Sequence, residues 1–170
     1  MSFPPIYTAR SRALILGTWP SPKSRAMAFY YGHPQNRFWP LMAALTGEPV
    51  PDTADVAAKT RLIQAHGLAL WDTLASCTIT GASDASIRNE VPNDVAGLLR
   101  RAPIEAVFCN GATAYKMYEK HLRGACGIAA VRLPSTSPAN AAVRPQQLRE
   151  IWGAALAPYL ENIREHNVNF

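Results

Sequence analysis

Residues 17–21 (Gly-Thr-Trp-Pro-Ser) form the first of three polar segments whose side chains could do chemistry. The segment follows an apolar run, and a glycine after a buried strand lets the backbone turn tightly and present its amides to a ligand. No Gly-Lys-Ser or Gly-Lys-Thr follows, so it is not the phosphate-binding loop of nucleotide hydrolases. Taken alone, an ordinary strand-to-loop turn would explain it equally well.

Residues 30–39 (Tyr-Tyr-Gly-His-Pro-Gln-Asn-Arg-Phe-Trp) gather aromatic and polar side chains around one proline. Tyr30 and Tyr31 precede a Gly-His-Pro turn, so we expect at least one ring to face a pocket. A nucleobase stacked on such a ring would gain ~1–3 kcal/mol. His33 could donate a proton, although a structural role in the loop explains it at least as well.

The other two segments lie later in the chain. Asn110 follows an apolar run, and its amide offers an acceptor and two donors that suit the edge of a base, although asparagine is also a common turn residue. Residues 133–140 (Leu-Pro-Ser-Thr-Ser-Pro-Ala-Asn) read as a hydroxyl-rich loop stiffened by two prolines. Such a loop suits phosphate contacts and could enter a duplex to support extrusion of a base.

Apolar runs alternate with helical segments along the whole chain. The runs predict strands at 13–16, 68–71, 104–108 and 128–133. Helices are expected at 38–45, 55–65, 113–122 and 145–159, with a further helix that Asn93 or Asp94 caps and that ends at Arg101. Residues 76–90 read as a long surface loop.

Strands separated by helices indicate an α/β fold with right-handed crossovers and a mainly parallel sheet. In such sheets a ligand binds beyond the carboxyl ends of the strands. The three polar segments all fall at predicted strand ends. The sequence therefore predicts that they converge on one site.

Composition narrows the choice of partner. Lys and Arg number 17 against 12 Asp and Glu, which gives a net charge of +5 and favours a polyanionic partner. The three cysteines are odd in number and show no Cys-x-x-Cys spacing, which argues against zinc, an iron–sulfur cluster and a disulfide framework. No apolar run approaches the ~20 residues of a membrane span, so we expect a soluble cytoplasmic protein and, by default, a monomer.

Several motifs resemble, in order, those of the uracil-DNA glycosylase superfamily. Residues 17–21 resemble its first motif, and residues 133–138 (Leu-Pro-Ser-Thr-Ser-Pro) resemble its second motif, the loop that enters the DNA. Residues 33–39 are very similar to the segment that follows the first motif in the mismatch-specific uracil glycosylases. The resemblance covers roughly residues 12–160.

The branch that the chain resembles most is that of the hypoxanthine-DNA glycosylases, also called DNA-deoxyinosine glycosylases. The features that carry this are the Gly-Thr-x-Pro-Ser first motif, the Ser-Thr-Ser-Pro second motif and Asn110-Gly111. The resemblance implies a three-layer α/β/α sandwich with a central four-stranded, mainly parallel sheet, as one domain over residues 1–170. It also implies a monofunctional glycosylase that removes a deaminated base from DNA, hypoxanthine first, with uracil and xanthine as alternatives.

The same resemblance implies the roles of site residues. Most of the superfamily places Asp or Asn in the first motif to orient the attacking water; here that position is Trp19, and Asn36 is expected to orient the water instead. Tyr31 is expected to stack on the flipped base. Amides near Thr18 and Trp19, together with Asn110, are expected to hydrogen-bond the base edge, which makes Asn36 and Asn110 the catalytic candidates.

DNA contacts are expected from two groups of polar and basic residues beside the motifs. They are Ser21, Lys23, Arg25, Ser135, Thr136, Ser137, Pro138 and Arg144. No metal or organic cofactor is implied. No lysine is convincingly placed for Schiff-base chemistry, so strand cleavage is not expected.

Two other functions remain open on the sequence. A hydrolase of free nucleosides could use the same pocket, but it would need neither the proline-stiffened loop nor the positive charge. A non-catalytic binder of damaged DNA is suggested by the missing first-motif carboxylate. We rank the glycosylase ahead of the binder, and the binder ahead of the nucleoside hydrolase.

Overall fold

A four-stranded parallel sheet forms the centre of the molecule. The structure is a computed structural model that describes residues 3–19, 25, 29–80 and 84–161. The strand order is β2 (Leu68–Asp72), β1 (Ala13–Gly17), β5 (Ala106–Asn110) and β6 (Ala130–Leu133). Every residue of β1 and β2 is buried, as expected for parallel strands covered on both faces.

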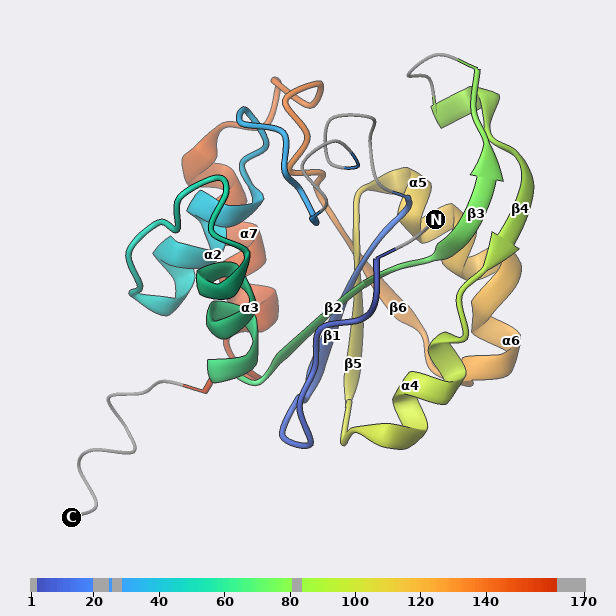
Figure 1. Ribbon diagram of the computed structural model, residues 1–170, viewed down its shortest axis with the longest axis horizontal. Coiled ribbons are helices and arrows are strands. Elements are labelled where there is room, and N and C mark those ends of the chain that lie inside the picture. Colours follow the sequence, from blue (N-terminus) through green and yellow to red (C-terminus); the bar gives the residue numbers. More distant parts are fainter. Residues whose placement is uncertain (1–2, 20–24, 26–28, 81–83, 162–170) are drawn as a thin grey trace.

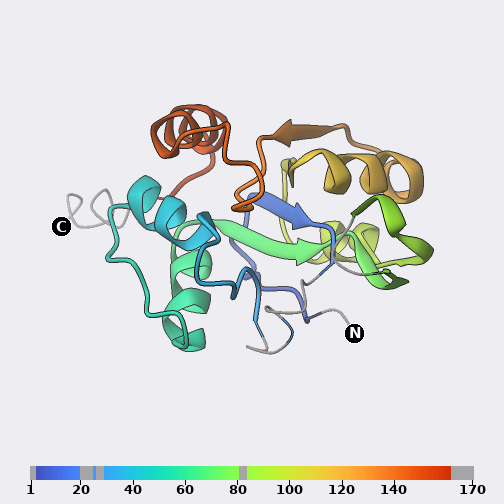
Figure 2. The ribbon, with the colours of Figure 1, turned by 90° about the horizontal axis from the view of Figure 1, so that it is seen from above.

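Helices cover both faces of the sheet, which confirms the predicted three-layer α/β/α sandwich (Figures 1 and 2). One face carries α2 (Phe38–Thr46), α3 (Val56–Ala65) and α7 (Pro145–Leu156). The other carries α4 (Val95–Arg101), α5 (Ala112–Met117) and α6 (Arg123–Cys126). Within the described part of the chain no helix is long and apolar enough to cross a membrane.

Side-chain caps set two of the helix starts. The Asp55 carboxylate accepts from the Ala58 N–H at 3.0 Å and begins α3. The Asp94 carboxylate accepts from the Gly97 N–H at 3.0 Å and begins α4, so of the two predicted caps it is Asp94 that acts. Gly47, in the left-handed conformation with φ of 75°, ends α2 as its position predicts.

The largest departure from expectation lies in residues 76–90, which are not simply a surface loop. The chain forms an antiparallel pair of β3 (Leu74–Thr78) and β4 (Arg88–Pro92), joined through a 3₁₀ turn at Asp84–Ser86. In Figure 1 this hairpin rises beside the upper edge of the sheet. Its two strands are short and mostly exposed, and their register shifts twice, so they lack the regular alternation that reveals a strand in a sequence.

A second departure affects the helix expected at 113–122. There α5 begins one residue earlier and passes through a π-helical turn, Tyr118–Leu122, into α6. The turn buries Tyr118, whose hydroxyl donates to the Ile128 carbonyl at 2.6 Å. The helix therefore reaches further than expected, to Cys126.

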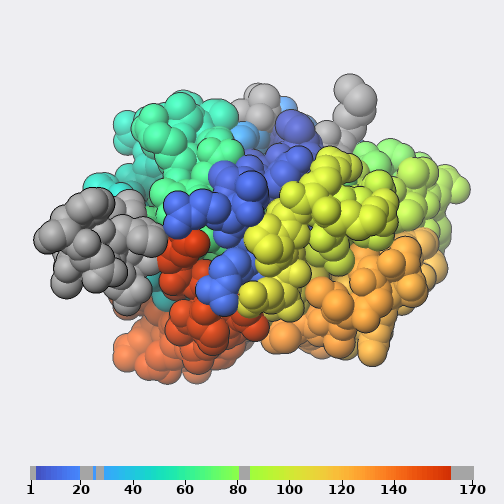
Figure 3. Space-filling model, turned by 90° about the horizontal axis from the view of Figure 1, so that it is seen from below, coloured from blue at the N-terminus to red at the C-terminus, as the bar shows by residue number. Residues whose placement is uncertain are grey.

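Figure 3 shows the opposite face, at the amino ends of the strands, where the segment that leads into β1, α4, α6 and α7 pack side by side. Here the Arg12 guanidinium bonds the Glu105 carboxylate at 3.0 Å, and the Glu105 N–H donates to the Arg12 carbonyl at 2.7 Å. This face ties the strand starts together. The polar loops lie at the other end.

Candidate active site

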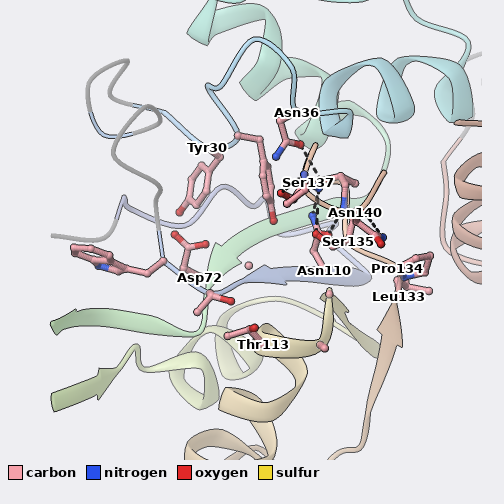
Figure 4. A pocket seen from close by; sticks show the side chains of 18 of the residues that line it. Tyr30, Asn36, Asp72, Asn110, Thr113, Leu133, Pro134, Ser135, Ser137 and Asn140 are labelled. Atoms are coloured by element: carbon pink, nitrogen blue, oxygen red, sulfur yellow. Dashed lines mark hydrogen bonds between the residues drawn. The ribbon is translucent and has the colours of Figure 1, made fainter. Parts of the chain in front are cut away.

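A cavity of about 600 Å³ opens at the carboxyl edge of the sheet. Its walls come from the ends of all four strands and from the loops that follow β1, β5 and β6. The three polar segments that the sequence singled out therefore converge, as predicted. In Figure 4 Asn36, Asn110, Ser135, Ser137 and Asn140 group together, while Asp72 and Tyr30 lie on the other side of the cavity.

A continuous chain of hydrogen bonds joins the two predicted catalytic asparagines through Thr136. The Asn110 Oδ1 accepts from the Thr136 N–H at 3.0 Å, and the Asn110 Nδ2 donates to the Thr136 hydroxyl at 3.0 Å. That hydroxyl donates in turn to Asn36 Oδ1 at 2.8 Å. The Phe38 N–H at the start of α2 also donates to this oxygen, at 3.0 Å.

Two backbone N–H groups fix the direction of every hydrogen bond between the two asparagines. A backbone N–H can only donate, so the atoms that face Phe38 N and Thr136 N must be the amide oxygens of Asn36 and Asn110. The Thr136 hydroxyl therefore receives from Asn110 and must donate to Asn36. Both lone pairs of Asn36 Oδ1 are occupied, which leaves Nδ2 as the Asn36 group with no hydrogen-bond partner among the described residues.

Arg37 holds the loop after β6 in place. Its guanidinium donates to the carbonyls of Ser137 at 3.1 Å and Asn140 at 3.0 Å, and also to that of Val143. The backbone adds a further bond, from the Arg37 N–H to the Thr136 carbonyl at 3.1 Å. A planar, permanently charged fork suits such a set of carbonyl acceptors. Arg37 therefore fixes the loop from within.

Two of the residues in this loop that are predicted to contact DNA have hydroxyl groups that can donate to a phosphate. Ser135 and Ser137 line the cavity, and their hydroxyl oxygens accept from the N–H groups of Ser137 and Ala139. Each hydroxyl hydrogen is left to donate outward, as a phosphate contact requires. Thr136 is buried, and its hydroxyl takes part in the hydrogen bonds between the two asparagines. Pro138 is exposed at the tip of the loop.

The remaining predicted DNA contacts are more scattered. Arg144 is exposed at the N-terminus of α7 and does not line the cavity. Arg25 is exposed, with its guanidinium 4.3 Å from the centre of the Trp19 ring. Ser21 and Lys23 lie outside the described residues.

Tyr31 lies between the two sides of the cavity. Its ring stacks on Phe38, with centroids 4.2 Å apart, and its backbone has a positive φ of 50°. Burial raises the pKa of its hydroxyl, the nearby Asp72 raises it further, and the Asn110 amide opposes both. The hydroxyl is thus a neutral donor, and it has no hydrogen-bond partner among the described residues.

Three residues of the first motif, Gly17, Thr18 and Trp19, line the cavity. The Gly17 carbonyl accepts from the Thr73 N–H at 2.8 Å, and the Thr18 carbonyl accepts from the Leu74 N–H at 3.0 Å. Trp19 lines the cavity but packs against the small cluster of Leu74, Ile87 and Met117 beneath the hairpin. His33 does not line the cavity, and its Nδ1 accepts from the Gln35 N–H at 3.0 Å, which supports its structural role.

Asp72 is a cavity residue that the sequence motifs do not single out. It ends β2, is 4% exposed, and lines the cavity. Burial raises its pKa to about 7. The rule that placed Asn110 at a strand end would also have found Asp72, since it directly follows the run at 68–71.

Gly17 and Gly111 make room for these groups. A Cβ on Gly17 would lie 2.6 Å from Asp72 Oδ1 and 2.9 Å from the Tyr31 hydroxyl, so these side-chain ends would have to shift to admit a larger residue. Gly111 has a φ of 94°, and a Cβ there would lie 3.0 Å from the Cβ of Ser135. Both residues let neighbouring strand ends approach closely.

The lining offers little to bind a metal ion. Among the described residues no group of three or more His, Cys, Asp and Glu side chains could hold one. The charged side chains that line the cavity are Asp72 and Arg132, and no described lysine does so. The cavity supplies amides, hydroxyls and aromatic faces.

Comparisons with known proteins agree with this geometry. The family model described as the uracil DNA glycosylase superfamily matches residues 4–156. Hypoxanthine DNA glycosylase of Methanosarcina acetivorans is 34% identical over 138 residues, which cover 81% of this chain and 86% of the relative. The Methanosarcina barkeri protein of the same name is 34% identical over 141 residues, with the same shares covered.

A solved structure shows the same fold. It is the solution structure of a Methanosarcina acetivorans protein described as a candidate uracil DNA glycosylase, and it is 33% identical to this chain. The TM-score is 0.79, with 93% of this chain and 96% of the other covered. Motifs, sheet order and relatives agree, and the chain belongs to the uracil DNA glycosylase superfamily.

Proposed function

We propose that this protein is a monofunctional DNA glycosylase that hydrolyses the N-glycosidic bond of a deaminated base, hypoxanthine first, after the nucleotide has flipped out of DNA. The observation that carries the proposal is the convergence of the three polar loops on one cavity of about 600 Å³. The two relatives named hypoxanthine DNA glycosylase support this choice of base.

DNA would be held through the loop at 134–143 and the basic residues around it. Hydroxyls of Ser135 and Ser137 donate to phosphates, and Arg144 supplies charge at the start of α7. Flipping the nucleotide costs a few kcal/mol, least for a weakened pair such as one containing hypoxanthine. Tyr31, supported from behind by Phe38, stacks on the base.

The chemistry relies on positioning rather than on a strong base. The C1′–N bond breaks with its electron pair leaving on the base, while water forms the new bond at C1′ and gives up a proton to solvent. The transition state resembles an oxocarbenium ion, so donors already aimed at the departing base stabilise its negative charge. Thr18, Trp19 and Asn110 line the cavity where such donors are needed.

Asn36 positions the water in this mechanism. Because Phe38 N–H and the Thr136 hydroxyl occupy its oxygen, Asn36 meets the water through Nδ2 rather than through Oδ1. The water keeps a second lone pair for C1′. Asn110 holds Thr136 and thereby Asn36.

We further propose that the base is removed without the Schiff base that strand cleavage needs. We also propose that the protein acts as a monomer.

The test is release of base from duplexes that contain a single hypoxanthine, uracil or xanthine, followed by chromatography. We expect wild type to release hypoxanthine, and Asn36→Ala and Asn110→Ala to be slowed by about 100-fold or more, as for other lost positioning groups. Strand breaks should appear only after alkali. Lesion-selective binding without release would indicate a damage binder, and faster attack on free inosine than on the duplex would indicate a nucleoside hydrolase.

A further inference from the structure

Residues 3–7 form a strap along the outer side of β2, at the edge of the central sheet. The strap runs antiparallel to β2: the Ile6 N–H donates to the Leu70 carbonyl, and the Leu70 N–H donates to the Ile6 carbonyl, each at 2.9 Å. Because the two segments run in opposite directions, the strap brings Phe3 to the carboxyl end of β2, where the cavity opens.

Side-chain donors from two other segments hold the Phe3 end of the strap. The Trp71 indole N–H donates to the Phe3 carbonyl at 2.9 Å. The Tyr30 hydroxyl also faces this carbonyl, at 3.0 Å, and the Pro4 carbonyl at 2.7 Å. Both partners of the hydroxyl are carbonyl oxygens, which can only accept, so the Tyr30 proton points at the strap. Two neighbouring segments therefore fix the backbone at Phe3.

The Phe3 ring forms part of the cavity wall. The residue is half-buried, lines the cavity, and packs edge to face on the Tyr30 ring, with the centroids 5.1 Å apart. Figure 4 shows Tyr30 across the cavity from Asn36. Phe3 and Tyr30 thus form an aromatic wall on the side away from the two asparagines.

The direction of attack determines which part of a flipped nucleotide meets this wall. In the proposed mechanism Asn36 positions the water, and water attacks C1′ on the side away from the departing base. The base therefore points away from Asn36, towards Tyr30 and Phe3. A purine is joined to its sugar through the five-membered ring, so its six-membered ring projects further than the single ring of a pyrimidine does.

We propose that Phe3 is a specificity-determining residue that selects a flipped purine over a flipped pyrimidine by length: its ring contacts the six-membered ring of the purine, and a pyrimidine on the same sugar does not reach it. Tyr30 is the positioning residue that holds Phe3 through the strap. The inference rests on the proposed function. It explains a preference for hypoxanthine over uracil by the size of the base.

Binding to DNA that cannot be cleaved tests this without the chemical step. The probes are fluorescent duplexes with a single 2′-fluoro-deoxyinosine or 2′-fluoro-deoxyuridine, because the fluorine disfavours the oxocarbenium ion and blocks cleavage. In Phe3→Ala we expect the Kd for the inosine probe to rise about 10-fold, as for one lost aromatic contact to a base. The Kd values for the uridine probe and for undamaged DNA should stay nearly unchanged.

Three further variants complete the design. Phe3→Leu keeps an apolar side chain in the wall and should lose less affinity for the inosine probe than Phe3→Ala. Tyr30→Phe removes only the hydroxyl, and should weaken binding of the same probe by about 3- to 5-fold. Tyr115→Ala truncates a half-buried aromatic residue of α5 that does not line the cavity, and should bind both probes as wild type does. Thermal unfolding checks that each variant is folded.

The outcomes separate the two proposals. An equal loss for the inosine and uridine probes in Phe3→Ala, or no loss for either, would overturn the selection by Phe3 even if wild type excises hypoxanthine. An unchanged inosine Kd in Tyr30→Phe would overturn the positioning role of Tyr30. If wild type releases no base yet shows the inosine-specific loss in Phe3→Ala, the role of Phe3 stands and the proposed catalysis fails.

Discussion

The hydrogen-bonded chain from Asn110 through Thr136 to Asn36 shows how one hydroxyl can orient two amides. Asn36 lies just before α2 and Asn110 ends β5, and the Thr136 hydroxyl bonds both side chains. Since the direction of each bond is fixed by a backbone donor, neither amide can flip without leaving a donor unpaired. The cavity is therefore organised before a substrate enters.

Removal of the central hydroxyl should uncouple the two amides. In Thr136→Val we expect the free energy of unfolding to fall by about 1–3 kcal/mol, because Asn110 Nδ2 loses its acceptor in a buried site. We expect the single-turnover excision rate to fall by about 10-fold or more, since Asn36 is no longer held. Urea unfolding and quenched excision time courses would measure both.

Thr136→Ser is the matched variant, because it keeps the hydroxyl and removes only the methyl group. It should retain most of the excision rate. Equal rates in the Val and Ser variants would show that the hydroxyl does not orient the asparagines.

Asp72 should make the stability of the protein depend on pH. The pKa of Asp72 in the folded protein, about 7, lies above the ordinary aspartate value of 3.8, so the folded state binds the proton more tightly and is destabilised as pH rises from about 4 to 7. The cost above pH 7 is on the order of 4 kcal/mol. Asp72→Asn should thus be more stable than wild type at pH 8, by a margin that narrows to about 1–2 kcal/mol at pH 5.

Urea unfolding at the two pH values would check this. A variant less stable than wild type at pH 8 would show that the carboxylate is well satisfied in the folded protein. Asp52→Asn, the same change at an exposed aspartate before α3, should show no such margin at either pH.

At the scale of elements, Arg37 connects the start of α2 to the loop after β6. Its contacts are backbone carbonyls rather than side chains, so it recognises the path of the loop and not its sequence. The loop also begins at a fixed point, where the Trp152 indole N–H of α7 donates to the Pro134 carbonyl at 2.9 Å. Two helices therefore hold the loop that is proposed to enter DNA.

Arg37→Lys should loosen that loop. An ammonium cannot reach several carbonyls at once, so we expect the KM for lesion DNA to rise by about 10-fold and kcat to change less, because binding depends on the ordered loop. Steady-state excision and limited proteolysis around residue 138 would measure the effect.

The same exchange on the exposed end of α4, Arg101→Lys, is the control and should leave KM unchanged. A larger fall in kcat than rise in KM for Arg37→Lys would mean that Arg37 acts on the chemical step instead of on the loop.

An element can be predicted from the sequence when the interactions that form it lie within a short stretch of the chain. The run at 13–16 and the cap at Asp94 are local signals, and the structure confirms both. The hairpin of β3 and β4 has no such local signal. Its strands are stabilised by pairing with each other and by the small cluster around Leu74. Its sequence therefore reads as a loop.

The site shows the same limit. Strand-end position predicts that residues 17–21, Asn110 and the loop after β6 come together, because parallel strands end at one edge. The roles of Arg37 and Thr136 depend on contacts between segments about a hundred residues apart, which no local pattern reveals. Asp72 follows a strand as Asn110 does, but its burial is not a local signal, because a carboxylate after a strand is normally solvated.

At the scale of the whole molecule, the net charge of +5 should make DNA binding strongly dependent on salt. Arg144→Gln should weaken binding to damaged and undamaged DNA alike, and should lower the slope of log K against log salt by about one. Fluorescence anisotropy across a salt series would give the slope.

Arg100→Gln, an equal loss of charge on the exposed end of α4, tests whether position or total charge matters. It lies away from the cavity and should leave the slope nearly unchanged. Equal slopes for the two variants would place the DNA elsewhere on the surface.

The sheet ends on one side at β6, and no described strand pairs with its outer side. An open strand edge can recruit the same edge of another copy and start aggregation. Here the strand has only four residues, and two of them are the exposed Arg132 and the half-exposed Val131. Two such edges would bring like charges together, which disfavours sheet-to-sheet aggregation in concentrated solutions.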